Sequence, residues 1–181
     1  MTMPYWETEH NAELLMRIQA AVAETGEELS FGPRMMDIGG RDGVAVPVLE
    51  LLGVRRKDIS IVDPAQSEVE RAVASGLILG HHAHPQSLEE YVDQGGAQVD
   101  SAALFNIQPR LSFDVNFMRA LGSVVRPRGL VVVTACEPAT VLTFRTNAER
   151  HAGLERIASA PRSVLPTFST SNNYLHLWRK A

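Results

Sequence analysis

The stretch RMMDIGGRDG, residues 34–43, decides the fold. Its first half, Arg34 to Ile38, is short and mainly apolar, which is typical of a buried strand. The second half is a glycine-rich turn, where residues without a Cβ let the backbone reverse sharply and approach a ligand closely. Asp37 stands at the end of the strand, so its carboxylate is predicted to face whatever binds beside the turn.

The type of hydrophobic periodicity alternates outward from this stretch. Short β-branched runs are separated by segments with apolar residues at helical spacing, a pattern that predicts a parallel sheet covered by helices. The expected helices are 8–25, 44–52, 67–75, 89–92, 114–125 and 148–158. The expected strands are 34–38, 59–62, 77–79, 101–105, 130–134, 163–168 and 174–178.

The last two expected strands are joined by the five turn-forming residues 169–173, a length suited to a hairpin. We therefore expect an α/β fold of the doubly wound type. Its mainly parallel seven-stranded sheet would carry helices on both faces and end in an antiparallel hairpin. The chain of 181 residues is predicted to form a single domain, with a helical cap over residues 1–33 and a core over residues 34–181.

Composition narrows the classes of function. Seventeen Lys and Arg against twenty-one Asp and Glu leave a net charge of -4, which argues against a dedicated nucleic-acid binder. One cysteine excludes a disulfide scaffold. The sequence shows neither a secretory signal nor an apolar run long enough to span a membrane, so the expected location is the cytoplasm and no membrane partner is expected.

The glycine turn does not match two common nucleotide loops. A phosphate-binding loop requires a Gly-Lys pair, and the chain has none. A dinucleotide fingerprint that begins at Gly39 would need glycine where Arg41 stands, and Asp37 would repel a diphosphate. An acidic residue ahead of the glycines instead favours a ligand with a positive charge.

Asp37-x-Gly39-Gly40-x-x-Gly43 resembles the first motif of class I S-adenosylmethionine-dependent methyltransferases, with Arg41 in place of the middle glycine. Four further segments resemble this family in order and spacing: Ile61 to Asp63, Ala103 to Asn106, Phe117 to Thr134 and Tyr174 to Trp178. The resemblance runs from about Leu14 to Arg179. It implies a Rossmann-like transferase that moves a methyl group from S-adenosylmethionine to an acceptor by in-line displacement.

The resemblance also implies the residues that bind the cofactor: Asp37, Gly39, Gly40, Gly43, Asp63, His82, Asn106 and Ile107. Asp37 would face the amino-acid end of S-adenosylmethionine, and Asp63 would accept both ribose hydroxyls. His82 lies in the region where the family contacts adenine, while Asn106 and Ile107 would flank the methyl-transfer face. No residue identifies itself as a general base, so the catalytic residue stays unknown.

Other conspicuous residues have simpler explanations. His81, His82 and His84 could suggest a metal, but neighbouring positions on an extended chain point to opposite faces, and we expect no metal site. Cys136 would need an adjacent base to act as a nucleophile, and none can be inferred from the sequence. Arg41 is either a surface side chain or the partner of Asp42 or of a substrate carboxylate.

Two other functions remain open at this stage. The missing glycine and the lack of an evident base also fit a catalytically inactive methyltransferase-fold module that binds or regulates. A nicotinamide-dependent oxidoreductase is the third alternative. For an enzyme, the expected partner is a small-molecule or protein acceptor, and a second copy of the chain could complete the pocket in a homodimer.

Overall fold

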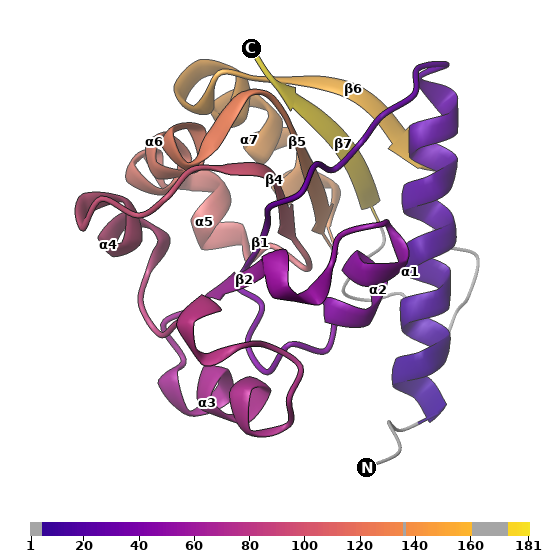
Figure 1. The fold of residues 1–181 in the computed structure, drawn as a ribbon. Helices are drawn as coiled ribbons and strands as arrows, with labels where there is room; N and C mark the ends of the chain where they lie inside the picture. The colour runs from indigo at the N-terminus through magenta and orange to yellow at the C-terminus, as the bar shows by residue number, and fades with distance from the viewer. Residues whose placement is uncertain (1–4, 136, 161–173) are drawn as a thin grey trace.

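The strands form one seven-stranded sheet in the order β3-β2-β1-β4-β5-β7-β6 (Figure 1). The computed structural model describes residues 5–135, 137–160 and 174–181. The strands are β1 Met35–Ile38, β2 Ile59–Val62, β3 Ala83–His84, β4 Val99–Leu104, β5 Val125–Ala135, β6 Leu154–Ala160 and β7 Tyr174–Lys180. Strands β1 to β5 pair in parallel, and β7 pairs antiparallel with both β5 and β6.

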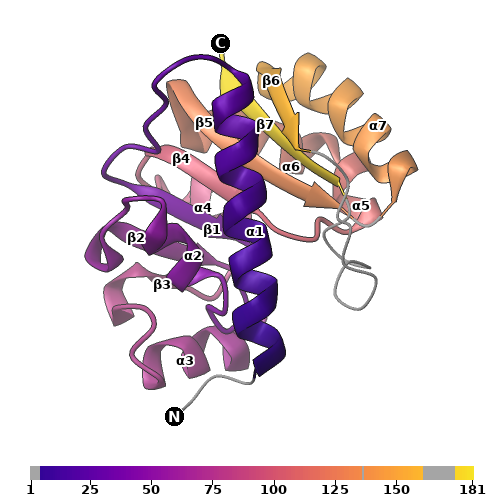
Figure 2. The same ribbon diagram turned by 90° about the vertical axis from the view of Figure 1, so that its right-hand side faces the viewer.

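Helices cover both faces of this sheet. They are α1 Tyr5–Glu24, α2 Val46–Leu51, α3 Gln66–Ala74, α4 Leu88–Asp93, α5 Pro109–Phe113, α6 Val115–Val124 and α7 Pro138–Asn147. Single turns of 3-10 helix occupy Arg56–Asp58 and Gly80–His82, and a π-helical turn occupies Ala148–Ala152. Figure 2 shows α1 crossing one face of the sheet, with α6 and α7 on the other face.

Side chains that alternate along each strand feed two separate hydrophobic cores. Met36, Val131 and Val133 pack with α4, α6 and α7 on one face. Met35 and Val132 pack with α1, α2 and α3 on the other. Since both faces of the central strands are buried, their sequences are continuous apolar runs, as parallel sheets require.

The expected doubly wound sheet with a terminal antiparallel hairpin is confirmed, and β2 has the predicted bounds. The boundary predicted at residue 33 falls in the connection between α1 and β1. The division into a cap and a core stays a prediction. None of the helices among the described residues is both long and apolar enough to cross a membrane.

The expected third strand over residues 77–79 is wrong. The amides of Leu77 and Ile78 instead bond to the Ala72 carbonyl and close the end of α3. Ile78 is buried while Leu79 is 42% exposed, so this apolar run anchors a helix end. The third strand is formed later, by Ala83 and His84.

The region before the hairpin also differs from the expectation. The helix predicted over 148–158 lies earlier, at Pro138–Asn147, and Leu154–Ala160 forms the edge strand β6. Gly153 marks the change, since it adopts the left-handed conformation that ends the π-helical turn. The strand expected over 163–168 and the turn over 169–173 lie outside the described residues.

Candidate functional site

The carboxyl ends of β1, β2 and β4 meet around Asp37. Its register partners are Ile61 of β2 and Ala103 of β4, both in parallel strands. The strand order reverses between β1 and β4, because β2 and β3 lie on one side and β5 to β7 on the other. In an open α/β sheet this reversal is where ligands bind.

Two glycines shape the loop that leaves β1. Gly39 and Gly43 have φ angles of 76° and 78°, which residues with a Cβ rarely adopt. The Gly39 amide donates to the Val62 carbonyl at 2.8 Å, which ties the loop to the tip of β2. A Cβ at Gly43 would lie 3.3 Å from the Ala72 side chain, so this glycine also permits close packing on α3.

Asp37 is buried beneath this loop with an unsatisfied carboxylate oxygen. Only 1% of the residue is exposed, and its Oδ2 atom has no hydrogen-bond partner. A Cβ at Gly40 would lie 2.6 Å from that oxygen, so only glycine lets the loop pass over the carboxylate. Burial, together with the nearby Asp63 carboxylate, raises the pKa of Asp37 to about 7.

Asp63 comes from the end of β2 and faces the same loop. It is 6% exposed, its Oδ1 accepts from the Ala65 amide at 2.7 Å, and its Oδ2 accepts from the Arg41 amide at 3.2 Å. A carboxylate offers about four lone-pair sites, so these two bonds leave acceptor capacity. The structure therefore brings together two predicted acidic residues that lie on different strands.

Arg41 pairs with a residue that sequence reasoning did not consider. Its guanidinium binds the Glu68 carboxylate of α3 through two hydrogen bonds, one of them 2.6 Å long. Its φ of 48° lies in the region that non-glycine residues seldom occupy. Arg41 therefore links the glycine loop to α3, and its side chain is 68% exposed.

His82 occupies a different place in the fold from the one that the sequence predicts. With a third strand at 77–79, His82 is expected after that strand, whereas in the structure it belongs to the 3-10 turn before β3. Its pKa is lowered by burial and by His81, with Asp58 acting in the opposite direction, and Asp58 precedes β2. His82 thus lies toward the amino end of β2. Gln86 follows β3 and lies near Asp63, since the amides of both residues donate to the His84 carbonyl.

Asn106 and Ile107 follow β4, as predicted, and their backbone is fixed to β5. The Asn106 amide donates to Thr134 Oγ1 at 2.7 Å, and the Ile107 amide donates to the Thr134 carbonyl at 2.9 Å. Asn106 has a φ of 55° and an exposed side chain, whereas Ile107 is buried. The sequence indicated the position of this turn but not the role of Thr134 as its anchor.

Asn11 of α1 contacts the backbone just after the glycine loop, at Val44, and the sequence did not predict this contact. Its side-chain amide donates to the Val44 carbonyl at 3.0 Å, across an interval of 33 residues. A single asparagine in a polar N-terminal segment gives no sequence signal for such a contact.

Within the parts of the chain that the structure describes, no three His, Cys, Asp or Glu residues cluster as a metal site would require. Cys136 lies outside the described residues.

Comparisons with known proteins agree with this architecture. No protein-family model matches the chain, and no curated protein matches its sequence. Among solved structures, the N-methyltransferase NodS from Bradyrhizobium japonicum superimposes with a TM-score of 0.65 at 12% identity, over 99% of each chain. The amino pentose methyltransferase CalS10 from Micromonospora echinaspora gives 0.64 at 12% identity, over 99% of this chain and 93% of that one.

A third similar structure is magnesium protoporphyrin IX methyltransferase from Synechocystis, with a TM-score of 0.60 at 12% identity. The match covers 100% of this chain and 86% of that one. The strand order, the antiparallel β7 and these similarities define the fold of class I S-adenosylmethionine-dependent methyltransferases. At 12% identity, the likeness concerns the fold, and the activity has to be argued from the site.

Proposed function

We propose that this chain is an S-adenosylmethionine-dependent methyltransferase. The observation that carries the proposal is the unpaired Asp37 Oδ2, buried beside Asp63 under the glycine loop. A buried carboxylate oxygen without a partner is unusual in a folded protein. A ligand with a cationic group would satisfy it, and S-adenosylmethionine carries both an ammonium and a sulfonium.

The residues of the loop fit that donor chemically. Asp37 would neutralise the amino group of S-adenosylmethionine, either directly or through water. Asp63 keeps acceptor capacity for ribose hydroxyls beside its two amide bonds. The similar structures named above include the S-adenosylmethionine complex of CalS10, and NodS has also been solved in complex with S-adenosylhomocysteine.

The donor supplies an activated methyl group on its sulfonium. The chain would contribute mainly position, since holding the reacting atoms in line is worth about 7–11 kcal/mol of the barrier. Asn106 and Ile107 are proposed to border the transfer face, and their amide bonds to Thr134 would keep that turn rigid. No side chain is assigned as a general base.

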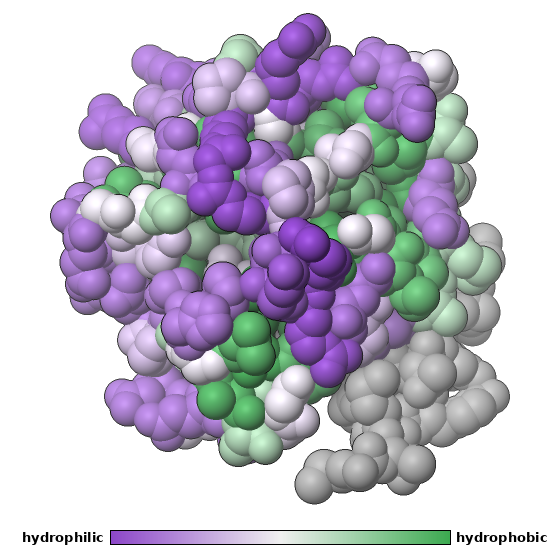
Figure 3. Space-filling model, in the orientation of Figure 1, coloured by the Kyte–Doolittle hydropathy of each residue, from purple (hydrophilic) through white to green (hydrophobic). Residues whose placement is uncertain are grey.

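The proposed acceptor is a small molecule or a protein. The net charge of -4 supports neither nucleic acid nor another polyanion as the substrate. Figure 3 shows a mainly hydrophilic face that is interrupted by hydrophobic areas over α1 and α2. Met16 on α1 and Leu51 on α2 are 61% and 67% exposed, which is compatible with the proposed homodimer.

Calorimetry with S-adenosylmethionine and S-adenosylhomocysteine tests donor binding directly. We expect saturable heat with both and a weaker affinity in Asp63→Ala. Asp58→Ala is the matched control, because Asp58 precedes the same strand at its other end and pairs with Arg55. The proposal would be contradicted if the chain bound NADH but neither S-adenosylmethionine nor S-adenosylhomocysteine, or if it bound none of the three.

A donor-binding module without catalytic activity is the second candidate. It is favoured by one observation: both Asp63 oxygens already accept backbone amides, and one of these belongs to Arg41, which replaces a glycine of the motif. Such a module would bind S-adenosylhomocysteine without forming it from the donor. Incubation with labelled S-adenosylmethionine and a panel of small-molecule and protein acceptors would separate the two candidates.

A further inference from the structure

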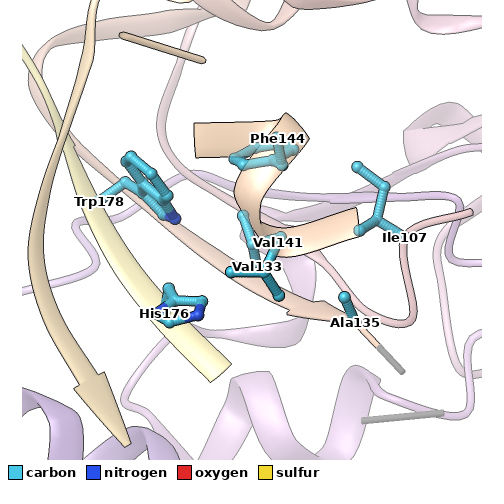
Figure 4. Close-up of a pocket in the computed structure, with 7 residues that line it drawn as sticks. All are labelled: Ile107, Val133, Ala135, Val141, Phe144, His176 and Trp178. Atoms are coloured by element: carbon cyan, nitrogen blue, oxygen red, sulfur yellow. The ribbon is translucent and has the colours of Figure 1, made fainter. Parts of the chain in front are cut away.

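A narrow crevice lies on the α7 face of the sheet, just below the carboxyl end of β5 (Figure 4). Its lining includes four apolar side chains, Ile107, Val133, Val141 and Phe144. Two further side chains, His176 and Trp178, come from β7. Ile107 adjoins Asn106, the residue proposed to border the transfer face. β4, which ends just before Asn106, pairs with β1 on one side and β5 on the other. The crevice therefore lies on the β5 side of β4, while Asp63 of β2 lies on the β1 side.

Two polar atoms in this apolar crevice have no hydrogen-bond partner in the described structure. They are Nε1 of Trp178, a residue with no exposed surface, and Nε2 of His176. Figure 4 shows both rings on the same side of β7, turned toward Val133. Phe144 holds the indole by an edge contact with ring centroids 5.5 Å apart. Buried indole N–H groups usually find a partner.

The other nitrogen of His176 is already engaged. Its Nδ1 lies 2.6 Å from the Ser159 hydroxyl on β6. Burial, with Arg156 and Arg17 adding to the effect, lowers the pKa of His176 to about 4, so the ring is neutral at physiological pH. If Nδ1 donates to Ser159, Nε2 is an acceptor. The crevice then offers one donor, from Trp178, and one acceptor, from His176.

A hydroxyl group complements this pair, because its oxygen accepts one hydrogen bond while its proton is donated to another atom. We propose that the crevice is a subsite for the methyl acceptor, and that it takes an uncharged, mainly apolar molecule through one hydroxyl group. This inference rests on the proposed methyltransferase function. Among the described residues that line the crevice, His176 is the one titratable side chain and it is neutral, so a charged acceptor group would be desolvated beside them without compensation.

The crevice is too narrow to admit a water molecule in this structure. Binding therefore requires a side chain to move. Val141 is the nearest candidate, since it is half-buried at the start of α7, whereas Phe144 on the next turn is fully packed. Opening at Val141 would expose the indole N–H without disturbing β7.

Proton–nitrogen NMR of the full chain tests the subsite with phenol and toluene as probes. The chain has two tryptophans, so Trp178→Phe identifies the Trp178 indole resonance by its loss. We expect phenol to shift this resonance saturably and toluene to bind at least about tenfold more weakly, since toluene leaves both nitrogens unpaired. His176→Ala should remove most of this preference. Leu142→Ala, at a 66% exposed position beside Val141, should leave it unchanged.

Equal binding of phenol and toluene, or an indole resonance that neither probe moves, would overturn the inference. Thermal melts establish that each variant is folded; if Trp178→Phe is not, backbone-based assignment of the wild-type resonance replaces it. Calorimetry with S-adenosylhomocysteine keeps the two proposals separate. Donor binding without a phenol response removes only the acceptor subsite, whereas a phenol response without donor binding removes the methyltransferase.

Discussion

Asp37→Asn should stabilise the donor-free protein, and the gain should depend on pH. The pKa of Asp37 is raised from 3.8 to about 7, mainly by burial. Between these values the unfolded chain has released its proton while the folded chain still holds it. The free energy of unfolding therefore falls as pH rises from about 4 to about 7.

The magnitude follows from the shift. A difference of about three pH units, at 1.36 kcal/mol per unit, corresponds to about 4 kcal/mol that the folded protein loses by pH 8. Asparagine has the shape of the protonated acid and cannot ionise, so it avoids this cost. For a chain of this size, about 4 kcal/mol corresponds to a rise in melting temperature of roughly 8–16 °C.

Urea unfolding of both proteins at pH 4.5 and pH 8 measures the effect. The two curves should nearly coincide at pH 4.5, and Asp37→Asn should be more stable at pH 8. Asp42→Asn is the control on the same loop, at a side chain that is 41% exposed, and should change stability by less than about 0.5 kcal/mol. A difference between wild type and Asp37→Asn that is equal at both pH values would refute the buried, protonated Asp37.

Three further substitutions test the site and its support. Asp63→Ala should weaken S-adenosylhomocysteine binding by about 1–3 kcal/mol, measured by calorimetry, because hydrogen-bonding groups of the ligand would lose their partner; an unchanged affinity removes Asp63 from the site. Gly40→Ala places a Cβ 2.6 Å from Asp37 Oδ2, so we expect about 1–3 kcal/mol of destabilisation by urea unfolding together with loss of donor binding. Gly122→Ala places a Cβ 2.6 Å from the Ala152 carbonyl oxygen and should lower the free energy of unfolding by a similar amount. The folded fraction of this variant should still bind donor, which distinguishes a packing defect from a defect in the site. Wild-type stability in this variant would show that α6 can shift.

The fold could be predicted from the sequence because the sequence patterns that indicate it are local. β2 and the order of strands and helices follow from apolar periodicity, and Asp37 was recognised because the glycines beside it mark the turn. Local signals fail where a tertiary contact decides. Leu77 and Ile78 have strand-like side chains, but the Ala72 carbonyl recruits their amides into a helix end. The same contact explains why His82 precedes β3, whereas a strand at 77–79 would place it after the third strand.

Sequence alone determined which residues could carry charge at the glycine turn, since residue type and spacing along one strand and its loop are properties of the chain. Tertiary structure decided which of them meet. Three contacts join residues far apart in sequence: the Arg41–Glu68 pair, the anchoring of Asn106 and Ile107 by Thr134, and the packing of the β7 side chains against Ile107 and Val133 in one crevice. Such contacts depend on the order in which the strands pair, which long-range packing decides and no local pattern encodes.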